Sequence, residues 1–236
     1  MNIEWALAGG GVGLVAGLLL RGTVFQLSVA SGEPLRTSCE RCGGPVGGRF
    51  AFRCQGCHRS LGRPLVLELL TAAVLGLLFW RFAGAPDAAG FAFVGVVGVA
   101  LAAIDISVQR LPDRLTLSLY PGLVVLFGLA AVLNGHPTEL VRALLGGVAL
   151  GGGYLILAVL SRGQLGGGDV KLAGGLGIAL GWLGWPVLLT GAAAGFVLMG
   201  VASVVLLLAG RITPKDSISF GPFMLAGALL TVMTST

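Results

Sequence analysis

Four cysteines in one short segment are the first side chains of this 236-residue sequence that could do chemistry. Cys39 and Cys42 form one Cys-x-x-Cys pair, and Cys54 and Cys57 form a second pair after eleven intervening residues. Two such pairs commonly supply four thiolates to a tetrahedral Zn²⁺ ion. We therefore predict a structural zinc site, with a redox pair or a site that has lost its metal as the alternatives. His58 follows the last pair and is interpreted as a solvated loop residue.

Acidic residues at the ends of apolar runs form a second candidate site. They are Glu68, Asp105, Asp113 and Asp169. An ionised side chain costs about 2.5–3.5 kcal/mol at the centre of a membrane helix, so such residues are functional candidates by default. Asp105 closes one apolar run, and Asp169 opens another directly after three glycines that begin at Gly166.

Asp105 and Asp169 could act together, although 63 residues separate them in the chain. Two carboxylates in a partly dry site share a proton, because like charges close together cannot both ionise easily. The ionised member can then take a proton from water while the protonated member donates to a peptide carbonyl, which is aspartic proteolysis. Helix capping is the alternative role for Asp169 alone, and Asp113 also suits the start of a helix.

The composition places these residues in a membrane. Hydrophobic residues make up 56% of the chain, charged residues make up 11%, and 41 residues are glycine. Soluble domains contain about 25% charged residues. These values, with a mean hydropathy of +0.95, exclude an ordinary soluble enzyme, a disordered chain and a nucleic-acid-binding domain. We predict an all-α, polytopic membrane helix bundle that contacts the lipid bilayer and binds no nucleic acid.

Eight apolar runs have the length needed to cross a hydrocarbon core of about 30 Å. They lie near residues 3–20, 65–83, 88–104, 115–133, 138–160, 171–182, 184–209 and 219–235. The first run lacks a basic start and is interpreted as a retained span. We divide the chain into a first transmembrane helix (1–20), a cytosolic four-cysteine zinc loop (21–64) and a transmembrane bundle that carries the aspartates (65–236).

The basic residues predict the orientation of these spans. Thirteen of the 15 lie in the connections after the first, third, fifth and seventh runs, and Arg81 and Arg142 are the two exceptions. Because positive residues favour cytosolic loops, we expect these four connections in the cytosol and both termini outside.

Glycines repeat at four-residue spacing in several of the expected spans. Small residues at this spacing let helix backbones approach closely in lipid. The groups are Gly9, Gly13 and Gly17; Gly147 and Gly151; Gly177 and Gly181; and Gly191 and Gly195.

Four stretches together resemble the type IV prepilin peptidase family (prepilin leader peptidase/N-methyltransferase), which are membrane aspartic proteases of the GxGD kind. They are the paired Cys-x-x-Cys loop with residues 63–71 after it, residues 104–116, residues 166–172 and residues 220–223. The resemblance implies that Asp105 and Asp169 are the catalytic aspartates. The residues that it places in supporting roles are Asp113, Lys171, Gly166, Gly168 and Glu68.

The resemblance also implies a place and a substrate. Such enzymes are multi-pass proteins of the bacterial inner membrane, and they cut the short basic leader of type IV prepilins and type II secretion pseudopilins on the cytosolic side. Many members then methylate the new N-terminal amine with S-adenosylmethionine. No oligomeric state follows from the sequence.

Two segments depart from the family pattern. The stretch between the cysteine pairs, residues 43–53, is shorter than in most members, and residues 23–26 read differently. Because methylation is associated with this half of the chain, a peptidase without methyltransferase activity is one alternative. Alternatives of another class are a proton-coupled transporter that uses Glu68, Asp105 and Asp169, and a non-catalytic assembly factor.

Overall fold

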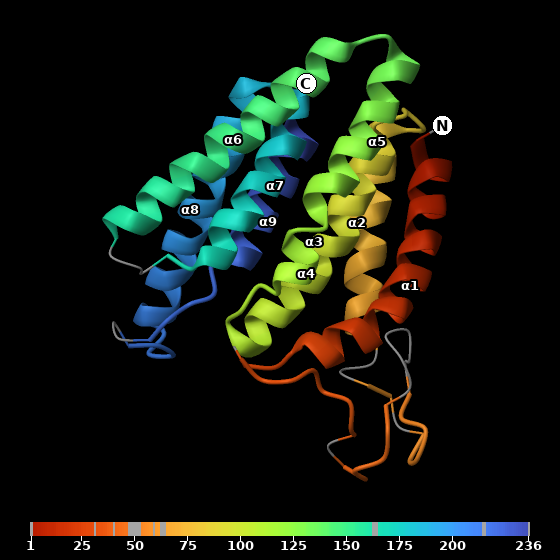
Figure 1. Ribbon diagram of the computed structural model, residues 1–236, viewed down its shortest axis with the longest axis vertical. Coiled ribbons are helices and arrows are strands. Elements are labelled where there is room, and N and C mark those ends of the chain that lie inside the picture. The colour runs from red at the N-terminus through yellow and green to blue at the C-terminus, as the bar shows by residue number, and fades with distance from the viewer. Residues whose placement is uncertain are drawn as a thin grey trace. The chain divides into compact units, whose positions relative to one another are not determined.

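The computed structural model describes residues 2–30, 32–39, 41–46, 53–58, 60–61, 65–161, 165–213 and 216–235 (Figure 1). These ranges contain nine helices and no strand, only two isolated β-bridges, which confirms the predicted all-α class. Several residues used for the predicted orientation and the family resemblance lie outside the described residues. They are Arg49, Arg59, Arg63, Pro64, Arg162 and Lys215.

The chain divides into two units, residues 1–112 and residues 113–236, and each is described by itself. The first unit contains α1 (Asn2–Leu27), α2 (Val66–Phe82) and α3 (Ala88–Val108). Successive helices run in opposite directions, so the C-terminal ends of α1 and α3 and the N-terminal end of α2 lie at one end of this unit (Figure 1). The cysteine loop connects α1 to α2 at that end.

The second unit begins with the short helix α4 (Asp113–Thr116). The helices that follow are α5 (Leu119–Asn134), α6 (Pro137–Leu160), α7 (Gly167–Leu183), α8 (Trp185–Leu208) and α9 (Gly221–Thr234). Within this unit α4 lies at the same end as the C-terminal end of α6 and the N-terminal end of α7 (Figure 1).

Five helical segments among the described residues are long and apolar enough to cross a membrane. They are Asn2–Leu27, Ala88–Val108, Asp113–Asn134, Pro137–Leu160 and Trp185–Leu208. The other three predicted spans, 65–83, 171–182 and 219–235, correspond to helices of 17, 17 and 14 residues. A helix of 17 residues is about 26 Å long, which is close to the thickness of the hydrocarbon core.

Three boundaries of these helical segments differ by four residues or more from the sequence-based expectation. One of them is the end of α3, which continues to Val108 instead of ending at residue 104. Helix α1 continues to Leu27, beyond the expected end at residue 20, because Arg21 is buried and pairs with Glu68. Helix α7 starts at Gly167 rather than at residue 171. Glycine disfavours a helix by about 1 kcal/mol per residue, and α7 is rich in glycine. Every residue from Leu172 to Trp182 is buried, so packing against neighbouring helices stabilises α7 despite its glycines.

The glycines of α1 allow its close contact with α2. A Cβ atom added at Gly13 would lie 2.5 Å from Cα of Ala72, and one at Gly17 would lie 2.5 Å from Cα of Glu68. At Gly9 the nearest atom is the backbone oxygen of Leu75, at 2.6 Å. The predicted close approach at four-residue spacing is therefore confirmed in the first unit.

Glycines also allow close helix–helix contact in the second unit, between α6 and α7 and between α8 and α9. Gly146 and Gly147 of α6 face Gly177 of α7, where an added Cβ would lie 2.5 Å from the oxygen of Gly146. Gly195 of α8 meets Gly227 of α9, where the closest distance is 2.4 Å. Both contacts bring backbone directly against backbone.

A single methyl group should disturb the α1–α2 contact. We expect Gly13→Ala to lower the free energy of unfolding by about 1–3 kcal/mol, because the methyl group has to displace the backbone of α2. Gly11→Ala is the matched control, since a Cβ there meets no described atom within 4 Å. Thermal unfolding of both variants in detergent measures the difference, and equal stability of the two would contradict the packing described here.

The two basic residues outside the expected cytosolic connections both have local partners. Arg142 of α6 donates from Nε to the backbone oxygen of Gly181 at 2.8 Å, and from Nη2 to that of Trp182. These carbonyls belong to the last turn of α7, where a cation is favourable. The guanidinium carbon of Arg81 lies 5.5 Å from the centroid of the Phe82 ring. Both residues therefore have a favourable contact in the structure, a helix cap for Arg142 and a cation–π contact for Arg81.

Candidate active site and metal site

Asp105 lies in the last turn of α3 and is buried. The helix ends three residues later, at Val108, and the N–H of Gln109 donates to the backbone oxygen of Asp105 at 2.8 Å. Gln109 has a left-handed φ of 50°, which stops the helix. The expected place of Asp105 at the end of an apolar helix is what the structure shows.

Two contacts fasten this end of α3 to the residues that follow α1. The hydroxyl groups of Ser107 and Ser28 lie 3.3 Å apart, and the Arg110 guanidinium donates to the backbone oxygen of Ala30 at 3.0 Å. The second contact uses a basic residue from the Asp105 motif. The end of α3 that carries Asp105 is thus attached to the segment after α1.

Asp169 lies in the first turn of α7 and is half-buried. Gly166 precedes the helix with extended backbone, and its carbonyl accepts the N–H of Asp169 at 3.0 Å. A Cβ atom at Gly166 would lie 3.2 Å from Oδ2 of Asp169, so glycine leaves room for the carboxylate. A helix N-terminus also favours negative charge. Gly166 therefore shapes the backbone from which Asp169 projects.

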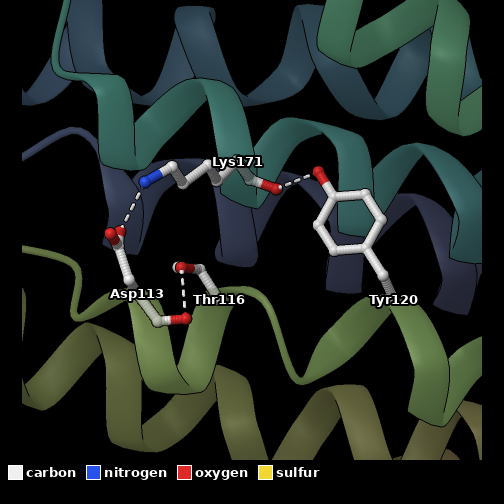
Figure 2. Close-up of polar contacts among 4 residues, drawn as sticks. All are labelled: Asp113, Thr116, Tyr120 and Lys171. Atoms are coloured by element: carbon white, nitrogen blue, oxygen red, sulfur yellow. Dashed lines mark hydrogen bonds and ion pairs between the residues drawn. The ribbon is translucent and has the colours of Figure 1, made fainter.

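Lys171 connects this turn of α7 to α4 and α5 (Figure 2). Its Nζ lies 2.6 Å from Oδ1 of Asp113, and its backbone oxygen accepts a hydrogen bond of 2.8 Å from the Tyr120 hydroxyl. The sequence motifs include Asp113 and Lys171 but not Tyr120. No sequence signal identifies Tyr120 as their partner, because it lies 51 positions from Lys171 in the chain.

The predicted site residues thus fall into three groups. Asp113, Asp169 and Lys171 lie at one end of the second unit, with Gly166 and Gly168. Asp105 belongs to the first unit, so its pairing with Asp169 stays a prediction. Glu68 is buried in an ion pair with Arg21 between α1 and α2.

The four cysteines form a compact cluster in the first unit. The Sγ atoms of Cys39 and Cys57 lie 3.8 Å apart, and those of Cys42 and Cys54 lie 3.5 Å apart. All four sulfur atoms lie within 4.8 Å of one another, and none is in a disulfide. The cluster could hold a metal ion, which is the arrangement that the spacing predicts.

The two cysteine pairs lie on turns of the same design, 15 residues apart. An isolated bridge joins Ser38 to Pro45 around the first pair, and another joins Arg53 to Ser60 around the second. The residue after each pair has a left-handed φ, 67° at Gly43 and 52° at His58. His58 is exposed and lies outside the cluster, in agreement with its interpretation as a solvated residue.

Backbone N–H groups in these turns favour the thiolate form of the first cysteine of each pair. The N–H of Cys57 has the largest influence on Cys54 and lowers the pKa of that thiol to about 6. The N–H of Arg41, followed by that of Cys42, lowers the pKa of Cys39. At Cys42 the N–H of Gly44 lowers the pKa, but the hydrogen bond with Cys54 and burial outweigh it and raise the pKa to about 11. Burial raises the pKa of Cys57. The backbone therefore favours the metal-binding thiolate form at one cysteine of each pair.

Loss of any one of these sulfurs should release the metal. We expect the purified wild-type protein to carry about one metal ion per chain and each of the four Cys→Ser variants to carry much less. His58→Ala is the matched control and should keep the metal, since His58 lies outside the cluster. Elemental analysis of reduced protein measures the content, and a wild-type protein without metal would refute the assignment.

Fold and site together define an all-helical membrane protein with a four-cysteine site and carboxylates at helix ends. A family model described as the type IV leader peptidase family matches residues 92–208. A prepilin leader peptidase/N-methyltransferase from Burkholderia pseudomallei (strain 1026b) is 33% identical over 223 residues, which cover 85% of this chain and 68% of the relative. The chain therefore belongs to the type IV leader peptidase family, and it is a peptidase.

Other relatives carry the same name. One from Klebsiella pneumoniae is 35% identical over 165 residues, covering 64% of this chain and 69% of the relative. Another from Aeromonas salmonicida (strain A449) is 30% identical over 209 residues, covering 80% and 68%. No solved structure matches the chain. These names do not support the transporter alternative.

Proposed function

We propose that this protein removes the leader of type IV prepilins and pseudopilins by aspartic proteolysis, with Asp105 and Asp169 as the catalytic pair. The observation that carries the proposal is the half-buried carboxylate of Asp169 in the first turn of α7, after the extended backbone of Gly166. It occurs within the segment matched by the leader peptidase family. The relatives named above are prepilin leader peptidases.

The chain itself supports the pairing of the two aspartates. Eight residues lead from Asp105 to Asp113, and a segment of that length spans at most about 28 Å when fully extended. Asp113 forms an ion pair with Lys171, two residues beyond Asp169. A short covalent segment and one ion pair thus link Asp105 to the turn of α7 that carries Asp169. This link supports the proposed pairing.

The chemistry needs one ionised and one protonated carboxyl group. The ionised group takes a proton from water, and the water oxygen attacks the carbonyl carbon of the scissile peptide bond. The protonated group donates to the carbonyl oxygen. Collapse of the tetrahedral intermediate then breaks the C–N bond, and a carboxyl group returns a proton to the leaving amine. Neither a covalent intermediate nor a metal takes part.

We assign the cysteine cluster to a structural Zn²⁺ ion. A Zn–S bond length of about 2.3 Å in a tetrahedron places sulfur atoms about 3.8 Å apart. The separations of 3.8 Å and 3.5 Å between opposite turns fit this geometry. The ion would be held by Cys39, Cys42, Cys54 and Cys57 and would order the loop between α1 and α2.

We also propose that the new N-terminal amine is methylated, as the names of the relatives indicate for those proteins. S-adenosylmethionine supplies the methyl group when it is bound. We assign three parts to this bifunctional enzyme: a first transmembrane helix, α1, that ends at Leu27, the cysteine loop after it, and the helical bundle from residue 65 onward.

The orientation in the membrane follows from the charges. Loops rich in arginine and lysine remain in the cytosol, and the described arginines of the cysteine loop include Arg36, Arg41 and Arg53. We therefore place the cysteine loop and both aspartates at the cytosolic face of the bacterial inner membrane, with both chain termini outside.

Mass spectrometry of a prepilin incubated with the purified protein tests both activities. We expect the leader to be lost at one bond, and we expect a mass increase of one methyl group only when S-adenosylmethionine is present. Cleavage without methylation would establish the peptidase alone. An uncut prepilin would overturn the proposal.

A further inference from the structure

We infer that Tyr120 is a positioning residue for Asp169, through its hydrogen bond to the first turn of α7. The inference rests on the proposed function, because it takes Asp169 to be catalytic. Tyr120 lies in α5 and does not occur in the motifs that suggest the family. Figure 2 shows its hydroxyl directed at the backbone of Lys171.

The Tyr120 hydroxyl donates to the backbone carbonyl of Lys171, which also belongs to the hydrogen-bond pattern of α7. In an α-helix the oxygen of Lys171 also faces the N–H four residues further on. The Tyr120 hydroxyl adds a second donor at 2.8 Å, from a side chain that is half-buried. Lys171 lies two residues after Asp169, so this contact holds the same turn of α7 that presents the carboxylate.

Two consecutive glycines make the contact possible. A Cβ atom added at Gly174 would lie 2.1 Å from the Tyr120 hydroxyl oxygen, and one at Gly175 would lie 3.0 Å from Cδ1 of Leu119. Only glycine at position 174 leaves room for the Tyr120 hydroxyl. The start of α5 therefore packs directly against the backbone of α7.

The ion pair between Asp113 and Lys171 is a second connection to the same turn. The Lys171 and Asp113 side chains are 39% and 62% exposed, so water screens the attraction and the pair holds α7 weakly. Tyr120 is half-buried, and its hydroxyl acts on the backbone rather than on a flexible side chain. Tyr120 is for this reason the residue that we expect to determine the position of Asp169.

Tyr120→Phe removes the hydroxyl and keeps the ring. With a type IV prepilin as substrate, we expect kcat to fall about tenfold and KM to change less than about twofold. We also expect the alkaline limb of the pH–rate profile to move to lower pH, because a less closely held pair of carboxylates repels less. Within the described part of this unit, Tyr154 interacts electrostatically with Asp169, and Lys171, two residues after Asp169, forms an ion pair with Asp113. A general loss of folded protein would lower the rate without moving this limb.

Two controls keep the test specific. Ser118→Ala removes a hydroxyl from the same segment, but the Ser118 hydroxyl donates to Leu115 within that segment, so kcat should stay unchanged. Gly174→Ala should lower kcat strongly in the wild-type background and less when combined with Tyr120→Phe, since the contact of 2.1 Å with the hydroxyl oxygen is then gone and the contacts at 3.0 Å and 3.3 Å with the ring carbons remain.

The result that overturns the inference is specific to it. If Tyr120→Phe has wild-type kcat and pH profile, or if the two substitutions at positions 120 and 174 act independently, Tyr120 has no positioning role. The proposed function survives that result as long as Asp169→Asn is inactive. An active Asp169→Asn variant would instead remove the proposed function.

Discussion

Replacing Asp169 by asparagine should abolish prepilin cleavage, with a loss of about 10³-fold or more in rate. Asparagine keeps the size of the side chain, but its amide can neither take a proton from water nor return one to the leaving amine. General acid–base catalysis by one positioned group contributes about 10²–10⁴-fold. The same loss is expected for Asp105→Asn, since the proposed reaction needs both carboxyl groups. Cleavage of a co-expressed prepilin, followed by gel shift and mass spectrometry, measures the rates.

The comparison needs a variant that loses a carboxylate elsewhere. Asp87 precedes α3, at the end opposite to Asp105, and Asp87→Asn should retain wild-type activity. Equal amounts of all three variants in the membrane fraction would show that insertion is unaffected. Full cleavage by both Asp105→Asn and Asp169→Asn would end the assignment of an aspartic peptidase mechanism.

The second large effect is expected at the buried ion pair of Arg21 and Glu68. Their side chains are 8% and 7% exposed, and they connect the two helices that flank the cysteine loop. Arg21→Met leaves the Glu68 carboxylate buried without its counter-charge, and Glu68→Leu does the same to the guanidinium. Breaking a buried pair in this way costs about 3–5 kcal/mol. We therefore expect both single variants to unfold at much lower temperature or denaturant concentration.

The double variant separates charge pairing from packing. Replacing a buried pair by apolar residues is often neutral in stability, so Arg21→Met combined with Glu68→Leu should recover most of the loss. Glu4→Gln is the matched control, since Glu4 is exposed in the first turn of α1. Single variants as stable as this control would show that the pair contributes nothing, and a double variant as unstable as the singles would show that only packing matters.

This ion pair also explains one error of the sequence-based boundaries. An arginine after an apolar run suggests that the helix leaves the membrane, and residue 20 is the natural end by that argument. Glu68 neutralises Arg21 from the neighbouring helix, so α1 continues to Leu27. The information lies in a partner 47 residues away, which hydropathy along the chain does not contain.

The same limit applies to Arg142 and Tyr120. Arg142 is an exception to the predicted charge asymmetry, and its contact with the last turn of α7 is visible only in the structure. Tyr120 is one of two tyrosines in the chain, and nothing in its sequence context indicates a role. The glycine pair at 174 and 175 indicates that another segment packs closely here, but the sequence does not identify that segment as the start of α5.

Local chemistry could be predicted from the order of residues alone. Short-range spacing determines which sulfurs can share one metal, long apolar runs require helices in lipid, and four-residue glycine repeats allow those helices to touch. All three depend on neighbours along the chain, and the structure agrees with each. The contacts of Arg21, Tyr120 and Arg142 required the folded chain, because each joins groups that are distant in sequence and meet through helix packing.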